Sequence, residues 1–198
     1  MTSDYPPLPS PLLAAGALLA TLAERAERPS LDSPAIDVMT DFTRVPAATI
    51  EPGATVAEAN QFMIRRGVRS LMVVDPSLRV LGIITARDVL GEMPVKVAQE
   101  RKVAFGEVQV RDVMTPAERL EAVSLEEVAA AKVGNVVATL ERSGRQHTLV
   151  VEAALERGRR VPRVRGIFSI TQIARELGIP IEGPPVGRTF AEVEAALR

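Results

Sequence analysis

The feature of this chain that most constrains its fold is an internal repeat. The segment Asp37-Val38-Met39-Thr40 returns 75 positions later as Asp112-Val113-Met114-Thr115. A unit of this length is too small to bury a complete core alone, so two copies are expected to pack against each other. We therefore expect an α+β fold built from two related units.

An apolar pattern at helical spacing follows each copy of the segment. Val56, Ala59 and Met63 fall at i, i+3 and i+7, and the same pattern begins again 77 positions later at Val133. This spacing places each trio on one face of a helix. We expect one helix in each copy here, ended by a glycine such as Gly67.

Short apolar runs rich in β-branched residues come next and predict paired strands. The expected strands are residues 71–75 and 80–85 in the first copy, and residues 148–152 and 164–169 in the second. A closing helix is expected over residues 86–90 and again over residues 170–177. The second copy gains seven residues between its strands, within residues 153–163, and this gain predicts an extended hairpin.

These elements divide the chain into five parts. They are an N-terminal Pro-rich arm and helix (1–30), a first repeat (31–92), a linker (93–109), a second repeat (110–178), and a C-terminal turn and helix (179–198). Each repeat is expected to be β-α-β-β-α.

Composition removes most enzyme classes. The chain has no Cys and one His, so disulfides, thiolate zinc sites and His clusters are excluded, and the common catalytic motifs are absent. We expect no catalytic residues, no metal and no required cofactor. The formal net charge of −1 disfavours nucleic-acid binding, although the Arg-rich hairpin over 157–165 keeps that alternative open.

The longest apolar stretch, residues 12–23, is too short to cross a bilayer. The residues before it include Asp4 and lack the basic start of a signal peptide. We expect a cytoplasmic protein without a membrane partner.

The repeated motifs resemble those of the cystathionine β-synthase (CBS) domain. The resemblance rests on the D-V-M-T opening, on G-V-R-S-L-M-V-V-D at residues 67–75, and on G-I-I-T-A-R-D at residues 82–88. Two copies over residues 36–178 resemble a Bateman module. The resemblance implies a pseudo-twofold axis, frequent dimerisation, and adenosyl ligands (AMP, ADP, ATP, NAD, S-adenosylmethionine or cyclic dinucleotides) bound in clefts between paired sheets.

The segment from Thr85 to Asp88 has two interpretations. Thr-x-x-Asp before a helix is a capping box, in which each side chain bonds the other residue's backbone amide. The resemblance implies instead that Asp88 accepts hydrogen bonds from both ribose hydroxyls and that Thr85 contacts phosphate. A carboxylate suits a diol because it only accepts hydrogen bonds. The two roles can coexist.

The resemblance also implies that this first cleft is completed by the second repeat. Its expected lining is Ile83, Thr85, Arg87, Asp88, Arg69, Thr115, Glu121, Gln146 and His147. Arg69 is a candidate phosphate donor, and Arg87 is either a ligand contact or a solvated charge. His147 would stack on adenine, face phosphate, or be an ordinary strand-edge histidine.

The second cleft is expected to be weaker. Its motif runs from Ser169 to Gln172, and Gln still suits a capping box while the charged diol acceptor is gone. The expected lining is Ala47, Ala48, Val68, Ser70, Ile167, Ser169 and Gln172.

The leading hypothesis is a non-enzymatic regulatory protein that senses an adenosyl nucleotide by conformational change and acts on a separate effector. A homodimer is expected because the closing helices carry apolar residues, namely Val89, Leu90, Ile173 and Leu177. The alternative is a structural or interaction dimer with non-functional clefts, which nucleotides would not stabilise.

Overall fold

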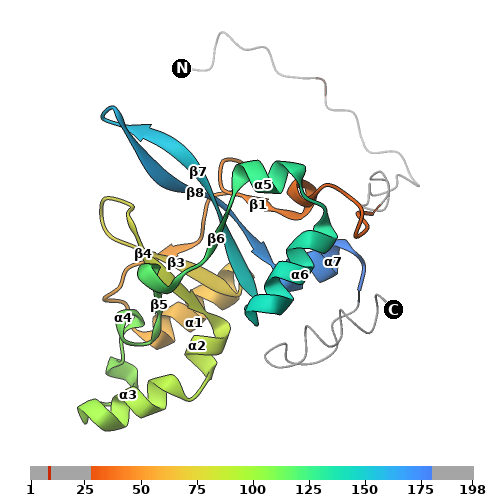
Figure 1. Cartoon of the computed structure of the whole chain (residues 1–198). Coiled ribbons are helices and arrows are strands. Elements are labelled where there is room, and N and C mark those ends of the chain that lie inside the picture. The colour runs from red at the N-terminus through yellow and green to blue at the C-terminus, as the bar shows by residue number, and fades with distance from the viewer. Residues whose placement is uncertain (1–8, 10–27, 180–198) are drawn as a thin grey trace.

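The computed structural model describes Pro9 and residues 28–179 (Figure 1). The expected N-terminal helix, within residues 1–30, and the C-terminal helix, within 179–198, lie outside the described residues. Within residues 28–179, no helix is long and apolar enough to span a membrane.

The described chain forms two four-stranded sheets with the same internal order. The first sheet is β2 (Thr49–Ile50), β3 (Ser70–Val74), β4 (Val80–Thr85) and β5 (Thr115–Pro116). The second is β6 (Ala122–Ser124), β7 (His147–Glu156), β8 (Arg159–Ser169) and β1 (Thr40–Asp41). Each sheet has one parallel pair followed by two antiparallel pairs. The expected α+β architecture of two related units is therefore present.

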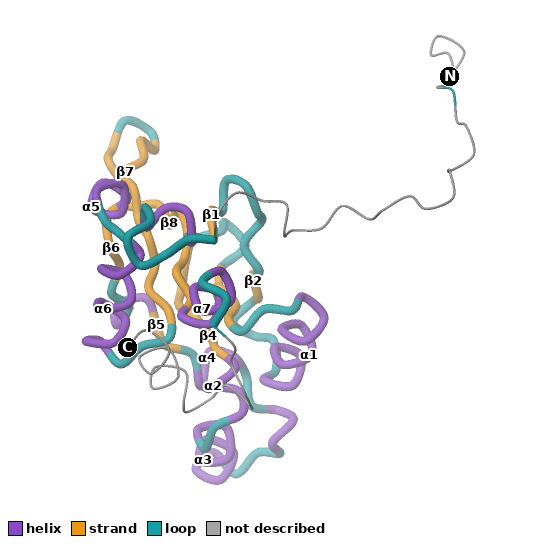
Figure 2. Tube along the Cα trace, turned by 90° about the vertical axis from the view of Figure 1, so that its right-hand side faces the viewer, coloured by secondary structure: helices purple, strands orange, loops and turns teal. Residues whose placement is uncertain are grey.

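Helices cover both sheets, and Figure 2 shows α5 and α6 on the opposite side of the molecule from α1. The helices of the first part are the 3-10 turn η2 (Ala35–Val38), α1 (Val56–Arg66), α2 (Ala86–Leu90), α3 (Met93–Arg101) and η3 (Phe105–Glu107). Those of the second are α4 (Val110–Val113), η4 (Ala117–Arg119), α5 (Leu125–Ala130), α6 (Val133–Ser143) and α7 (Ile170–Glu176). The segment expected as a linker, 93–109, thus contains α3, whose Val97 packs in the first core.

The repeats exchange their opening strands. Strand β1, from the first repeat, pairs with β8 of the second, with Thr40 opposite Ile167. Strand β5, from the second repeat, pairs with β4 of the first, with Thr115 opposite Ile83. The preceding turns follow the same exchange, because η2 packs in the core of the second repeat and α4 in that of the first. Neither core is complete within one repeat.

Two glycines at equivalent positions make this exchange sterically possible. A Cβ on Gly82 would lie 2.4 Å from the carbonyl oxygen of Thr115, and one on Gly166 would lie 2.6 Å from that of Thr40. A side chain at either position would push the exchanged strand away from the sheet. Gly82 and Gly166 therefore have a structural reason to be glycine.

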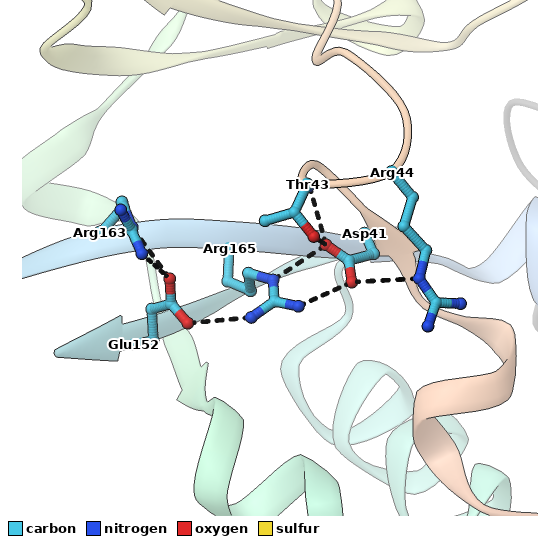
Figure 3. A network of polar contacts seen from close by, with 6 residues as sticks. All are labelled: Asp41, Thr43, Arg44, Glu152, Arg163 and Arg165. Atoms are coloured by element: carbon cyan, nitrogen blue, oxygen red, sulfur yellow. Dashed lines mark hydrogen bonds and ion pairs between the residues drawn. The ribbon is translucent and has the colours of Figure 1, made fainter. Parts of the chain in front are cut away.

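A network of charges fastens β1 to the second sheet (Figure 3). Arg165 donates from Nε and Nη2 to the two carboxylate oxygens of Asp41, both at 2.9 Å, and from Nη1 to Glu152 at 3.0 Å. Thr43 also donates to Asp41. The Arg165 guanidinium and the Thr43 donors hold the pKa of Asp41 well below its usual range.

The two sheets meet through a small apolar cluster. Its buried members come from both repeats and are Met72, Val74, Ile83, Leu149 and Ile167. The interface places the carboxyl end of β4 beside the amino end of β7. Side chains from both repeats consequently line the spaces at the edges of the interface.

The apolar residues expected to require a partner subunit are mostly covered. Val89 is 5% exposed and Ile173 is fully buried inside their own cores, so the premise for a dimer through these side chains was wrong. They are buried because α2 and α7 pack their apolar faces onto their own repeats. Leu90 alone among the four is largely exposed, at 63%.

Candidate functional site

The first cavity, which we call the Asp88 cavity, has a volume of about 340 Å³ and lies between the two repeats. The structure brings together eight of the nine residues expected there: Ile83, Thr85, Arg87, Asp88, Thr115, Glu121, Gln146 and His147. Arg119, Leu120, Gly144, Arg145 and Leu149 complete the lining. The first repeat thus supplies the Thr85–Asp88 segment, and the second supplies the opposite wall.

Arg69 is the exception, because it lines the other cavity. Backbone hydrogen bonds explain why Arg69 lies in that cavity and not in the Asp88 cavity. The carbonyl of Arg69 accepts from the Ala86 amide at 2.9 Å, just as the carbonyl of Gln146 accepts from the Ile170 amide at 3.0 Å. Arg69 and Gln146 are therefore equivalent residues of the two repeats, and each faces the cavity completed by the opposite repeat.

The capping box at the start of α2 is formed. Thr85 donates to Asp88 Oδ2 from its amide and from Oγ1, both at 2.8 Å, and the Asp88 amide donates to Thr85 Oγ1 at 3.3 Å. Both bonds that the Asp88 carboxylate accepts use Oδ2. No donor within residues 28–179 is bonded to Oδ1, so one carboxylate oxygen of Asp88 stays available at the cavity surface. Capping and ligand binding are compatible in this geometry.

Three arginines surround the Asp88 cavity. Arg145 donates from Nη1 and Nη2 to the backbone carbonyl of Arg119, both at 3.1 Å, and so ties η4 to the segment before β7. Arg87 is exposed at the start of α2. None of the three makes an ion pair within the described chain. The cavity therefore combines guanidinium groups that have no carboxylate partner within residues 28–179 with the carboxylate of Asp88.

His147 is the residue that both cavities share. It begins β7 opposite Ser169, at the junction between the repeats. Burial, and secondarily the positive charge of Arg69, lower the pKa of His147 to about 4. The imidazole is consequently neutral at pH 7 and can accept as well as donate one hydrogen bond.

The second cavity, which we call the Gln172 cavity, has a volume of about 270 Å³. It contains all seven residues expected there: Ala47, Ala48, Val68, Ser70, Ile167, Ser169 and Gln172. It also contains Arg69 and additional side chains that include Phe42, Arg66, Met72, Thr171 and Arg175. The two cavities therefore occupy corresponding places in the two repeats.

The expected capping box of the second repeat is not formed. Ser169 makes no side-chain cap bond to α7. The Gln172 amide instead donates to Glu176 Oε1 at 2.6 Å and accepts from Arg175 Nη1 at 3.3 Å. The longer Gln side chain reaches along the helix rather than back to its first turn. This expectation was wrong for α7.

Several cavity residues were not singled out from the sequence. Arg145 directly follows Gly144, the glycine that ends the preceding helix, and the 77-residue offset relates Arg145 to Val68, which was assigned to the second cavity. That offset was the signal available for Arg145. Arg175 had no such signal, because its contribution depends on the orientation of α7.

Comparison with known proteins agrees with this geometry. Residues 35–95 match the family model of the CBS domain. An uncharacterised protein of Methanopyrus kandleri is 36% identical over 58 residues, which are 29% of this chain and 30% of that protein. The match therefore spans less than a third of that relative.

Solved structures share the fold over a larger part of the chain. An uncharacterised conserved protein from Pyrococcus horikoshii aligns with a TM-score of 0.53 at 19% identity, covering 78% of this chain and 99% of that one. A CBS-domain-containing protein from Agrobacterium tumefaciens gives 0.52 at 19% identity, with 77% and 98% covered.

CBSX2 of Arabidopsis thaliana, solved in complex with AMP, gives a TM-score of 0.51 at 22% identity. The alignment covers 72% of this chain and 94% of that one. The duplicated sheets, the exchanged strands and these matches lead to one conclusion: residues 35–95 are similar to the CBS domain, and the described chain has the fold of the CBS-pair proteins.

Proposed function

We propose that this protein is a regulatory, non-catalytic sensor that binds an adenosine nucleotide in the Asp88 cavity. The observation that carries the proposal is the free Oδ1 of Asp88 inside a cavity that both repeats line. A carboxylate oxygen accepts two hydrogen bonds without offering a donor, as a ribose diol requires. The AMP complex of the similarly folded CBSX2 supports this choice of ligand class.

The rest of the cavity suits the other parts of such a ligand. The apolar side chains of Ile83, Leu120 and Leu149 form a surface for a base. Arg119 and Arg145 carry charges that suit phosphate, because guanidinium groups bind phosphate through paired donors. The cavity therefore offers an acceptor, an apolar wall and cations to one molecule.

The same placement supplies a means of regulation. Asp88 belongs to the first repeat, whereas Arg145 and His147 belong to the second. A ligand that bonds both sides stabilises the arrangement of repeats in which both can reach it, and so shifts the population toward that arrangement. An effector that recognises this arrangement would receive the signal.

The substitution Asp88→Asn tests the proposal. Asn at the third helical position still caps a helix in this protein, because Asn135 Oδ1 accepts from the Lys132 amide at 2.9 Å. The charge is lost, and the free acceptor Oδ1 is replaced by an NH2 group that only donates. Because a hydrogen bond to a charged group contributes roughly 1.5–3 kcal/mol, the Kd for AMP should rise about tenfold to a hundredfold in calorimetry.

The melting temperature without ligand separates this role from capping. The Asp88→Asn protein should melt close to the parent, since the cap is conserved in kind. An Asp88→Asn protein that binds AMP as tightly as the parent while melting at a lower temperature would reduce Thr85 and Asp88 to a capping box. The proposed site would then be wrong.

A further inference from the structure

The β7–β8 hairpin extends away from the body of the molecule (Figure 1). On one side of it, β6 ends at Ser124, opposite Val151, and on the other side β1 pairs no further than Gly166. Residues 152–163 of the hairpin, which we call the arm, therefore have no neighbouring strand on either edge within the described chain. Both faces and both edges of the arm are accessible to another molecule.

The arm carries a positive charge. It contains four Arg and two Glu, whereas the whole chain has a net charge of −1. One of the two carboxylates is already paired, because Arg163 donates to Glu152 Oε1 at 2.9 Å and Arg165 donates to Glu152 Oε2 at 3.0 Å (Figure 3). Guanidinium groups without a carboxylate partner therefore predominate on the outer part of the arm.

These outer arginines are exposed and make no ion pair within residues 28–179; they are Arg157, Arg159 and Arg160. Arg157 forms the turn with Gly158, and the two residues have φ angles of 49° and 79°. A two-residue turn with both φ angles positive favours Asn or Gly at its first position. An arginine there carries a backbone cost that Asn or Gly would avoid, which points to a role for its side chain.

A groove of about 660 Å³ lies between the base of the arm and α5. Most of its lining is apolar and comes from both elements, namely Leu125, Ala129, Val151, Ala153, Val161 and Pro162. Arg160 also lines the groove and is paired across the hairpin with Leu155, which is 77% exposed. Because residues directly opposite each other share a face of the sheet, a cation and an exposed apolar side chain lie together beside the groove.

The chemistry of this surface fits a protein segment better than a nucleic acid. A nucleic acid presents a continuous row of phosphates, which would meet the exposed carboxylates of Glu126 and Glu156 as well as the arginines. It also offers little to the apolar lining of the groove. A peptide can place carboxylates against the guanidinium groups and apolar side chains in the groove.

We propose that the arm and the groove beside α5 form a docking surface for another protein. The surface binds a segment in which acidic and apolar residues alternate. Its carboxylates bond the three outer arginines, and its apolar side chains pack between the hairpin and α5. This inference goes beyond the adenosine site and does not require that site to be correct.

Calorimetry on the full chain with a capped peptide of alternating Glu and Val tests the proposal. The peptide is about seven residues long, which spans roughly 20 Å when extended. We expect binding that the double variant Arg159→Gln and Arg160→Gln weakens at least about tenfold, because charge-assisted contacts are lost. The matched control is Arg65→Gln with Arg79→Gln, which removes the same charge from exposed positions elsewhere and should leave the affinity within about threefold.

A second pair of variants tests the groove. Ala129 and Ala130 are adjacent exposed residues of α5, but only Ala129 lines the groove. Ala129→Glu should weaken peptide binding at least about tenfold, because it places a bulky negative charge where the acidic segment lies, and Ala130→Glu should weaken it far less. Both variants should melt at the same temperature, since both side chains are exposed.

Four results overturn the proposal. Equal weakening by the arm variant and its control would mean general electrostatic attraction. Equal effects of Ala129→Glu and Ala130→Glu would exclude the groove. Tighter binding of a mixed-sequence single-stranded oligonucleotide than of the peptide would assign the arm to nucleic acid. The last is an absence of peptide binding at millimolar concentration.

The AMP experiment on Asp88 is independent of these outcomes. The Asp88→Asn protein should bind the peptide as the parent does, and the Arg159→Gln, Arg160→Gln protein should keep its affinity for AMP. Failure of the docking surface and failure of the adenosine site are therefore distinguishable.

Discussion

At the scale of single residues, Asp88 shows how one side chain meets two demands. Its Oδ2 completes the cap of α2 while its Oδ1 is left for another partner. The sequence motif predicted both roles but could not assign them to separate atoms. That division depends on the rotamer of Asp88, which only the folded cavity determines.

The titration of His147 makes the stability of the folded protein depend on pH. Because its pKa is about 4 in the folded protein and about 6.5 when unfolded, the unfolded state binds more protons between these values. The contribution of neutral His147 to the free energy of unfolding is fully present above pH 6.5 and is lost as the pH falls toward 4. Between pH 7 and pH 5 the free energy of unfolding should decrease by about 2 kcal/mol from this residue.

The variant His147→Gln isolates that contribution, because Gln does not titrate. Urea denaturation at pH 7 and pH 5 should show a markedly smaller difference for the variant than for the parent. The carboxylates with lowered pKa, such as Asp41, lose their contribution mainly below pH 5 and so affect both proteins alike. Equal pH dependence in the two proteins would contradict the neutral state of the half-buried His147.

At the scale of elements, local pattern predicted local structure. Strand β4 (Val80–Thr85) and helix α2 (Ala86–Leu90) have the predicted bounds, because an apolar run and a capping motif mark them within a few residues. The long β7–β8 hairpin was also predicted, and its register continues to Glu156 opposite Arg159.

The exchange of β1 and β5 was not predicted. Each strand is two residues long and pairs with a partner far along the chain, as Thr40 does with Ile167. So short a segment has no periodicity to read. What stabilises β1 is the charge network of Asp41 and Arg165, and complementary charges 124 residues apart leave no pattern in a sequence.

A substitution at Gly82 tests directly whether β5 pairs with β4 as the exchange of strands requires. In Gly82→Ala the new Cβ would meet the carbonyl oxygen of Thr115, so β5 would have to move from β4. We expect a loss of roughly 1–3 kcal/mol in urea denaturation, the usual cost of overpacking. The control is Gly106→Ala, whose Cβ would have no atom within 4 Å and should change stability far less.

A Gly82→Ala protein as stable as the Gly106→Ala protein would show that β5 is not held against β4 in solution. The Asp88 cavity would then lose part of its lining, because Thr115 of β5 lines it.

At the scale of the whole molecule, the two cavities correspond in position but differ in chemistry. The repeat predicted their lining well, since all seven residues expected in the Gln172 cavity and eight of nine in the Asp88 cavity lie there. Arg69 was misplaced although Val68 and Ser70 on either side of it were assigned to the Gln172 cavity, and the 77-residue offset that relates Arg69 to Gln146 was the signal available. The homodimer stays a prediction and now rests on exposed Leu90, Met93 and Phe105, which lie on contacting elements.

The central claim is that the Asp88 cavity recognises the ribose diol of an adenosine nucleotide. Calorimetry of the unmodified protein with AMP and with its 2′,3′-dideoxy analogue tests it most directly, because the ligands differ only in the two hydroxyls. We predict measurable binding of AMP and about tenfold to hundredfold weaker binding of the analogue. Equal affinities, or no binding of AMP, would contradict the claim.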